Sequence, residues 1–331
     1  MRIIDFFDRG ALIARDRVCT HDLETGRQRS YAQVQRASHQ IANGLLRLGA
    51  VPEQTKIAVY SPNCGRALES VLGVLRCAAV WAPVNARNSV RDIARLLDDN
   101  DVEILLYHSD HAGHLDEIRG ACPKLRAFVP IDVDPPGAEH SVDRWLAAPF
   151  EAAPAVKERR DAPMAIFGSG GTTGRPKGVV HSHRTWECLA MNVNVSMPPR
   201  NGAPVHLVVA PMTHAAGAMA LPLLTVGATQ VMMKAFDAKA VLRAIGAHRV
   251  THLFLPPTAV YMLLAEPGVR EHDYTSLEYF VYAAAPMSVE KIRQAIDVFG
   301  PVMVQTYGQT EAGALIGTFF SAQAHGGAPR G

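Results

Sequence analysis

What the sequence of 331 residues lacks excludes several classes of protein. Its net charge is only +2, so it offers no sign of the strongly basic face that nucleic-acid binding requires. Its 5 cysteines include no CxxC pair, so neither a zinc site nor a disulfide framework is indicated. We therefore expect a protein that does not bind nucleic acid, with buried thiols, in a reducing compartment such as the cytoplasm.

The sequence also lacks a secretory signal and a convincing membrane span. Its N-terminus carries charges every few residues, without an uninterrupted apolar core. One uncharged stretch lies between His214 and Lys234, but Gly217, Pro222 and Gly227 interrupt it. Such interruptions suit a buried helix, turn and strand better than a lipid-exposed helix. We expect no transmembrane segment, and nothing in the sequence indicates an oligomeric state.

Short apolar runs alternate with amphipathic helical patterns along most of the chain. The apolar runs predict strands at 56–60, 80–85, 103–107, 127–131, 165–167, 205–210, 229–233, 252–255, 279–283 and 302–305. Apolar residues three or four apart predict helices over 31–49, 90–97 and 288–299. This alternation predicts an α/β fold of two packed subdomains, with largely parallel sheets covered by helices.

Two stretches break this alternation. Residues 132–163 are rich in proline, alanine and charge without a sustained period, which indicates a surface connection. We therefore expect one α/β subdomain over 1–160 and a second over 161–318. Periodicity is lost near the end of the chain, so we expect residues 319–331 to be unstructured.

A glycine-rich segment, "GSGGTTGRPKG" (168–178), follows the apolar run 165–167. Its glycines let the backbone approach an anion closely, while Ser169, Thr172 and Thr173 add hydroxyl donors and Lys177 adds a positive charge. The segment is not a Walker loop, because Lys177 follows a proline and Gly178 replaces the required serine or threonine. The spacing also departs from the dinucleotide fingerprint. A polyphosphate grip and a plain flexible turn both remain open on this segment alone.

Three further motifs follow it in order, and together the four resemble the adenylate-forming superfamily of acyl-CoA synthetases, adenylation domains and luciferases. "SGGTTGRPKGVVHSH" is similar to the signature loop of that family. "PMTHAAG" (211–217) resembles its substrate-gate motif, "AAAPMS" (283–288) its adenine loop, and "QTYGQTEAG" (305–313) its Tyr-Gly-x-Thr-Glu motif. The resemblance extends over nearly the whole chain, up to about residue 317.

The resemblance implies a role for each motif in an ATP-dependent, Mg²⁺-dependent activation of a carboxylic acid. Lys177, His214, Thr310 and Glu311 would be catalytic, and Thr172 and Glu311 would serve Mg²⁺. The implied ATP-binding residues are Ser169, Gly170, Gly171, Thr172, Thr173, Gly174, Lys177, Ala283, Ala284, Ala285, Pro286, Tyr307, Gly308, Gln309 and Thr310. The implied substrate pocket comprises His214, Ala216, Gly217, Met219 and Ala284.

Taken singly, several of these residues have ordinary structural interpretations. An isolated histidine such as His214 is commonly a satisfied side chain, Tyr307 is compatible with packing, and Glu311 suits a helix start. His181 and His183 invite a metal site, but no third ligand is evident, so we interpret both as structural.

The substrate class can be narrowed from the residues around the gate motif. An amino acid would need a carboxylate to pair with its ammonium group, yet no Asp or Glu occurs between Asn201 and Phe236. An uncharged acid with a fatty or aryl tail fits best. The resemblance implies coenzyme A as the second substrate and an AMP-forming acid–thiol ligase as the enzyme.

The resemblance also implies parts that the sequence does not contain: a ribose-binding aspartate motif, a hinge and a small C-terminal domain with a catalytic lysine. We therefore expect a fragment or truncated form with impaired catalysis. The alternative is a non-catalytic ATP-binding homologue that acts as an interaction module.

Overall fold

A computed structural model describes residues 1–157, 159–168, 178–313 and 317–320 of the chain. The chain divides into two compact units. Unit 1 comprises Met1–Asp16 and Arg29–Cys188, and unit 2 comprises Arg17–Gln28 and Leu189–Gly331. Residues 161–188, which we expected in the second subdomain, thus group with the first part of the chain.

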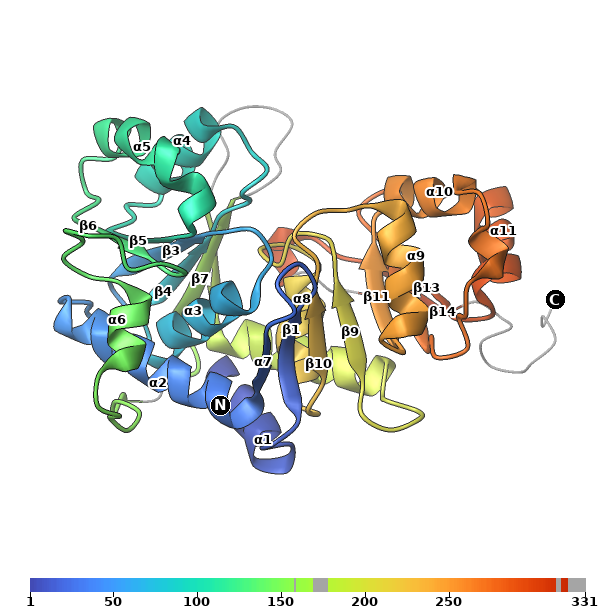
Figure 1. The fold of residues 1–331 in the computed structure, drawn as a ribbon, viewed down its shortest axis with the longest axis horizontal. Helices are drawn as coiled ribbons and strands as arrows, with labels where there is room; N and C mark the ends of the chain where they lie inside the picture. The colour runs from blue at the N-terminus through green and yellow to red at the C-terminus, as the bar shows by residue number, and fades with distance from the viewer. Residues whose placement is uncertain (158, 169–177, 314–316, 321–331) are drawn as a thin grey trace. The chain divides into compact units, whose positions relative to one another are not determined.

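Unit 1 is built on a six-stranded sheet (Figure 1). Its order is β6 (Ala127–Pro130), β5 (Ile104–Tyr107), β3 (Lys56–Tyr60), β4 (Val80–Pro83), β7 (Pro163–Gly168) and β8 (Gly178–Ser182). The strands from β6 to β7 are parallel, and β8 returns antiparallel to β7.

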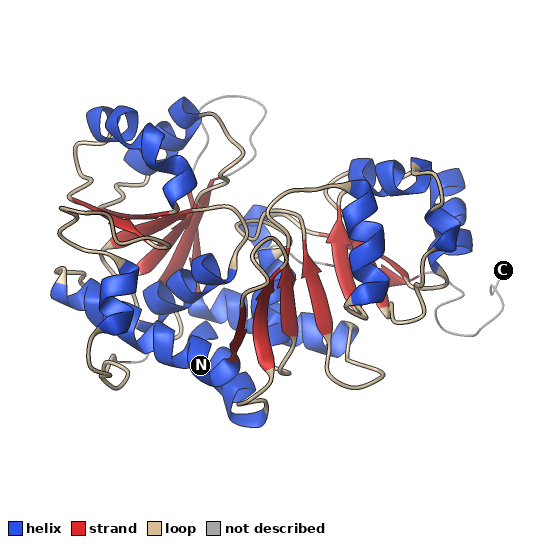
Figure 2. Cartoon of the chain, viewed as in Figure 1, coloured by secondary structure: helices blue, strands red, loops and turns tan. Residues whose placement is uncertain are grey.

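Helices cover both faces of this sheet (Figure 2). They are α1 (Ile3–Ile13), α2 (Tyr31–Arg47), α3 (Gly65–Arg76), α4 (Val90–Asp99), α5 (Leu115–Ala121) and α6 (Val142–Ala147), with the 3-10 helix η1 (Ser109–His114). The predicted helix over 31–49 is confirmed as α2. Ser30 starts it by accepting a hydrogen bond from the backbone N–H of Gln33, and Gly49 follows its end with φ +82°.

The helix α6 lies inside the stretch that we expected to be a surface connection. Ser141 caps its N-terminus, and Val142 and Trp145 are buried. A Cβ added to Gly44 of α2 would lie 2.3 Å from Trp145 Cδ2, so the indole occupies the space that this glycine leaves open. The expectation therefore missed a packed helix within a segment rich in proline and charge.

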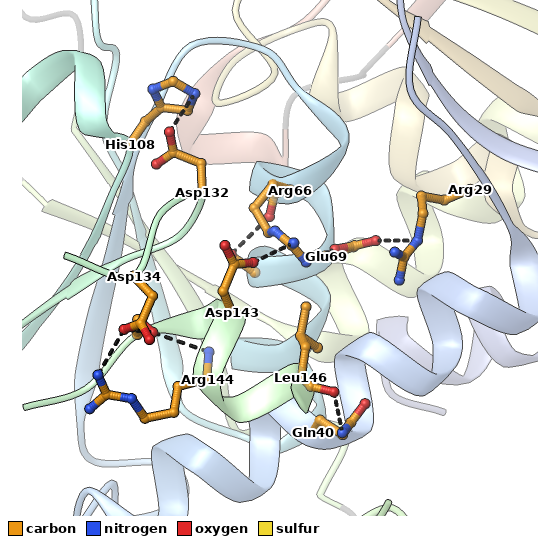
Figure 3. Close-up of polar contacts among 12 residues, drawn as sticks. Arg29, Gln40, Arg66, Glu69, His108, Asp132, Asp134, Asp143, Arg144 and Leu146 are labelled. Atoms are coloured by element: carbon orange, nitrogen blue, oxygen red, sulfur yellow. Dashed lines mark hydrogen bonds and ion pairs between the residues drawn. The ribbon is translucent and has the colours of Figure 1, made fainter. Parts of the chain in front are cut away.

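Unit 1 buries a group of paired charges (Figure 3). Arg66 donates to Glu69 Oε2 and to Asp143 Oδ1, each at 2.7 Å, and Arg29 Nε lies 3.4 Å from Glu69 Oε1. Both Arg66 and Glu69 are buried. Because an unpaired charge is costly away from water, this network fixes the start of α3 through its mutual pairing.

Unit 2 contains most of an eight-stranded sheet. Its order is β14 (Gly317–Phe320), β13 (Met303–Tyr307), β12 (Tyr279–Tyr282), β11 (His252–Leu255), β9 (Val205–Val208), β10 (Thr229–Met232), β1 (Val18–Asp22) and β2 (Gln28–Ser30). The strands from β13 to β1 are parallel, and β14 is antiparallel to β13.

The remaining helices pack on this sheet. They are α7 (His183–Ser196), which begins in unit 1, α8 (Gly217–Leu224), α9 (Ala238–Ala247), α10 (Pro257–Ala265) and α11 (Val289–Phe299), with the 3-10 helices η2 (Val269–Glu271) and η3 (Thr310–Ala312). The predicted helix, turn and strand after His214 is confirmed as α8 and β10. In the described part of the chain, no helix is long and apolar enough to span a membrane.

A row of buried polar side chains crosses the middle of this sheet. The strand registers pair Thr20 with Gln230, Gln230 with His206, His206 with His252, and His252 with Tyr279. All five are buried. His206 Nδ1 donates to Gln230 Oε1 at 2.8 Å. We call these five residues the polar row.

Both histidines of the polar row are uncharged at neutral pH. Burial lowers the pKa of His206 to about 4, although the hydrogen bond that His206 donates to Gln230 opposes the shift. Burial, assisted by the neighbouring His206, lowers the pKa of His252 to about 3. Burial disfavours a charged imidazole, whereas a neutral imidazole can form hydrogen bonds with neutral partners, as His206 does with Gln230.

Each strand predicted from an apolar run is present in the structure, with bounds that shift by a few residues. The short strands β1, β2, β8 and β14 were not predicted. Phe319 and Phe320, in the range that we expected to be unstructured, belong to β14. Three cysteines are buried as expected, but Cys188 is exposed and Cys64 is half-buried.

Candidate functional site

The glycine-rich segment connects two antiparallel strands of unit 1. Gly168 at the end of β7 pairs in register with Gly178 at the start of β8. The predicted phosphate-binding residues Ser169, Gly170, Gly171, Thr172, Thr173, Gly174 and Lys177 lie outside the described residues. Their roles stay predictions. A strand, not a helix, follows the segment, which separates it from the strand–loop–helix arrangement of Walker and dinucleotide loops.

Aromatic side chains anchor the hairpin that carries this segment. The ring of Phe167 stacks on Trp186 at 5.9 Å and lies edge-on to Trp81 at 5.8 Å. Trp186 Nε1 donates to His181 Nδ1 at 3.1 Å. His181 and His183 are both buried, and desolvation lowers the pKa of His183 to about 4. The described surroundings of these two histidines are those of packed side chains, in agreement with their structural interpretation.

His214 lies in the loop after β9 in unit 2. Thr213 Oγ1 lies 3.0 Å from His214 Nδ1, and the His214 carbonyl accepts from the backbone N–H groups of Gly217 and Ala218. The side chain is exposed, but surrounding protein atoms desolvate the ring enough to lower its pKa below 6.5. At neutral pH the loop therefore presents an uncharged imidazole.

The same loop depends on Gly217. A Cβ at this position would lie 1.9 Å from the carbonyl oxygen of Met212, far inside van der Waals contact. Only glycine allows the chain to close this turn, which begins α8 and orients His214. Of the residues predicted for the substrate pocket, Ala216 and Met219 are buried against the core at 1% and 4% exposure. Their side chains pack against the core beneath the turn, and their contact with a substrate stays a prediction.

The loop after β12 contains the predicted adenine contacts. Ala284 has φ +74°, in the left-handed region of backbone conformation that residues other than glycine rarely adopt. Ala284, Ala285 and Pro286 are exposed. Ser288 caps α11 through Lys291 N, and its own N–H donates to Tyr261 Oη at 3.2 Å. A strained, exposed backbone at a strand end is typical of ligand sites.

The loop after β13 contains the predicted nucleotide and metal contacts. Tyr307 is 52% exposed, and Gln309 Nε2 donates to its hydroxyl group at 2.6 Å. Thr310 and Glu311 form the short helix η3, and Glu311 is exposed. An exposed carboxylate and hydroxyl oxygens are ligands that suit Mg²⁺, so Glu311 fits the predicted metal role.

The structure brings three of the four motifs to one edge of one sheet. The motif loops follow β9, β12 and β13, which are parallel, so all three leave at the carboxyl ends of their strands. Open α/β sheets bind ligands at this edge. Sequence reasoning missed Thr213 and Tyr261. The Thr213 hydroxyl group is hydrogen-bonded to the ring of His214, and the Tyr261 hydroxyl group accepts from the backbone N–H of Ser288. Only the adjacency of Thr213 to His214 could have suggested the first.

A family model described as "AMP-binding enzyme" matches residues 7–329. The chain belongs to the AMP-binding enzyme family. The adenylate-forming resemblance and the α/β fold with mostly parallel, helix-covered sheets are thereby confirmed.

Several curated AMP-binding relatives are similar to this chain. A feruloyl-CoA synthase from Amycolatopsis sp is 31% identical over 287 residues, covering 86% of this chain and 54% of the relative. A 4-coumarate–CoA ligase-like protein from Oryza sativa subsp. japonica is 30% identical over 334 residues, covering 92% of this chain and 55% of the relative. The chain spans about half the length of the curated relatives it matches.

Solved structures share the fold of this AMP-binding chain. The inhibitor-bound N-terminal domain of FACL13 from Mycobacterium tuberculosis aligns with a TM-score of 0.88 at 24% identity, covering 98% of this chain and 80% of that one. The amide bond synthetase McbA from Marinactinospora thermotolerans aligns with a TM-score of 0.83 at 24% identity, covering 96% and 61%. At these identities the likeness shows the fold alone.

Proposed function

We propose that this chain provides the ATP- and carboxylate-binding part of an AMP-forming ligase of the acyl-CoA synthetase type. The observation that carries the proposal is the match to AMP-binding enzymes over residues 7–329, together with three motif loops that leave one sheet edge. The names of the relatives, feruloyl-CoA synthase and 4-coumarate–CoA ligase-like, support an acid as substrate and coenzyme A as acceptor.

In the proposed first step, a carboxylate oxygen of the substrate attacks the α-phosphorus of ATP. The bond from that phosphorus to the bridging oxygen breaks, pyrophosphate leaves, and an acyl-adenylate forms. Thr172, Thr173 and Lys177 would hold the departing phosphates, and Thr310 would donate to the α-phosphate. Mg²⁺, held by Glu311 with Thr172, would compensate charge on the phosphate oxygens when bound.

The nucleotide base and the carboxylate would contact the other two loops. The ring of Tyr307, turned to solvent and held by Gln309, offers a stacking surface for adenine, and Ala283–Pro286 would line its edge. His214 would border the carboxylate as a neutral imidazole, because desolvation lowers its pKa. A neutral ring donates a hydrogen bond to the carboxylate without pairing with it so strongly that attack is slowed.

In the proposed second step, the thiol of coenzyme A attacks the acyl carbonyl carbon, the acyl–phosphate bond breaks and AMP leaves. A hydrophobic acid with an aryl or fatty tail fits the absence of Asp and Glu between Asn201 and Phe236. We also propose a cytoplasmic location, since the cysteines in the described residues are unpaired thiols, as expected in a reducing compartment.

Acid-dependent exchange between ATP and labelled pyrophosphate tests the first step on this chain. We expect exchange with ferulate or octanoate but not with an amino acid, and loss of exchange in Lys177→Ala. Lys239→Ala, at an exposed lysine paired with Glu266, is the matched control. Binding of ATP without acid-dependent exchange would favour a non-catalytic ATP-binding module, and acid-independent phosphate release would contradict the proposal.

A further inference from the structure

A tyrosine from a neighbouring helix holds one end of the loop over residues 283–288 in unit 2. The backbone N–H of Ser288 donates to Tyr261 Oη at 3.2 Å. Tyr261 belongs to α10 and Ser288 directly precedes α11, and Figure 1 shows these two helices beside each other. The hydrogen bond therefore joins the end of the loop to a different helix.

The side chain of Tyr261 is itself fixed by the core of unit 2. Its partly buried ring packs against the core cluster that includes Val260 and Leu264 of the same helix. The helix begins with Pro257, a residue that suits the first helical turn, and Leu263 is also buried. The position of the Tyr261 hydroxyl group is thus set by core packing and not by the loop that it contacts.

The loop is held at both ends and strained between them. It leaves β12 after Tyr282, and at its far end Met287 is buried while Ser288 caps α11 by accepting from the Lys291 N–H at 3.3 Å. Between these points Ala284 is exposed and has φ +74°. Such a conformation persists only where the surrounding contacts maintain it, and the Tyr261 hydrogen bond is one of those contacts.

The strained part of the loop begins beside an exposed aromatic ring. Tyr282 of β12 pairs in parallel register with Gln305 of β13, and Tyr282 Oη donates to Gln305 Oε1 at 3.3 Å. Continued by two residues, this register brings Ala284 level with Tyr307, whose ring is 52% exposed. An exposed ring beside exposed backbone suits a planar ligand that stacks on the ring while its edge meets the backbone.

We propose that Tyr261 is a positioning residue for the nucleotide base, acting through the Ser288 N–H on the loop that meets the edge of that base. The inference rests on the proposed function, since it assumes that residues 283–286 and Tyr307 bind adenine. Loss of the hydroxyl group releases the end of the loop and weakens binding of the base. The phosphates contact other loops under that proposal, so their binding is unaffected.

The test is calorimetric titration of the purified chain with adenosine and with AMP. In Tyr261→Phe we expect about fivefold weaker binding of both, the effect of losing one hydrogen bond. The two losses should be equal because both ligands carry the same base. Unchanged adenosine affinity, or a larger loss for AMP than for adenosine, would overturn the inference.

The matched control removes a hydroxyl group at the opposite end of the same strand. Tyr279 begins β12, and its Oη donates to the Pro198 carbonyl at 2.8 Å. Tyr279→Phe should destabilise unit 2 but leave adenosine affinity within about twofold of wild type. Hydrogen exchange at the amides of β11 and β12 measures the stability of unit 2 in both variants. An equal loss of adenosine affinity in Tyr279→Phe would show a general loosening of the unit and overturn the inference.

The donor side of the hydrogen bond gives a second test, which also serves if Tyr261→Phe does not fold. Ser288→Pro removes the N–H, and the φ of −65° at this position suits proline. Because the change also removes the hydroxyl group that caps α11, Ser288→Ala is its matched control. We expect adenosine to bind about fivefold more weakly to Ser288→Pro than to Ser288→Ala, and equal affinities would overturn the inference.

A double variant tests whether the two residues act through one hydrogen bond. Adding Tyr261→Phe to Ser288→Pro should cause no further loss of adenosine affinity, because the bond is already absent. A further fivefold loss would show that Tyr261 acts by another route and overturn the inference. Failure of the wild-type chain to bind adenosine and AMP at all would instead refute the proposed function.

Discussion

One buried polar cluster in each unit shows a different way to keep polar groups away from water. In unit 1 the buried side chains of Arg66 and Glu69 are paired charges, and the partly exposed Asp143 also pairs with Arg66 beside α3. Unit 2 buries neutral groups, with His206 and His252 kept unprotonated in the polar row. Removing one member of a charged network destabilises the fold, because the other member is left buried and unpaired. A neutral network is destabilised when one of its members gains a proton. The two clusters should therefore respond to different perturbations.

The chain offers a direct way to observe the units separately. Its 3 tryptophans, Trp81, Trp145 and Trp186, all belong to unit 1. Tryptophan fluorescence therefore reports on unit 1, while hydrogen exchange at the amides of β9 and β11 reports on unit 2.

Removing the central carboxylate of unit 1 should have the largest effect. Glu69→Ala leaves Arg66 buried with one fewer partner and Arg29 without its 3.4 Å ion pair, so unit 1 should lose about 3–5 kcal/mol of stability. Urea unfolding followed by tryptophan fluorescence measures the loss. Asp116→Ala, at a side chain that is 98% exposed, is the control. A loss no larger than that of the control would contradict the ionic character that we assign to unit 1.

Closing the space at Gly217 should act on unit 2 alone. In Gly217→Ala the new methyl group overlaps the Met212 carbonyl, and overpacking of this kind costs about 1–3 kcal/mol. Exchange at β9 amides should accelerate while the tryptophan transition stays in place. Gly120→Ala in unit 1 should leave β9 exchange unchanged. If the tryptophan transition shifts as much as β9 exchange, the two units do not respond separately.

Acid should weaken unit 2 through its polar row. The folded pKa of His206, about 4, lies below its ordinary value of 6.5, so between these pH values the unfolded chain binds a proton that the folded chain does not. Stability is therefore full above pH 6.5 and falls by about 1.4 kcal/mol per pH unit for each such histidine as pH drops towards 4.

The slope of stability against pH, and not its absolute value, tests this prediction. His206→Gln removes one titrating group, so exchange at β9 amides should depend less steeply on pH. His272→Gln, at a side chain in unit 2 that is not buried, is the control. An unaltered slope in His206→Gln would mean that the polar row does not determine the acid response.

Relief of backbone strain at Ala284 should have the smallest effect. Glycine adopts φ +74° without a steric penalty, so Ala284→Gly should stabilise unit 2 by about 0.5–1 kcal/mol despite the entropy it adds to the unfolded chain. Ala283→Gly, at a neighbour without positive φ, should destabilise it instead. Calorimetric unfolding compares the two variants, and equal shifts of the same sign would rule out the strain.

Apolar periodicity was enough to predict the central strands. Segments such as KIAVY at 56–60 and HLFL at 252–255 are buried on both faces, which gives continuous apolar runs. Strands without a continuous apolar run gave no such signal. In β1, which lies between β10 and β2, the segment VCTHD carries three polar residues. In β8, an edge strand, only two apolar residues of the segment GVVHS follow the glycine-rich stretch.

Parts of the candidate site were predictable and parts were not. The order of motifs singles out His214, Tyr307 and Glu311 as candidates, since their neighbours in sequence carry the pattern, and their roles stay predictions. Gly178 at the start of β8 lies so near Asn100, at the end of α4, that an added Cβ would be 2.7 Å from Asn100 Oδ1, and no local pattern encodes this close approach. No local pattern predicts α6 either, because its Trp145 packs into the space that Gly44 of α2 leaves open.

The strand β1 has a consequence for how the chain is made. Thr229 of β10 donates a hydrogen bond to the carbonyl of Val18, across 211 positions of sequence. During synthesis β1 emerges early, but the strand beside which it belongs follows only after all of unit 1. Until then the apolar side chains of Val18 and Cys19 have no sheet to join, so nascent chains should need protection from aggregation at this segment.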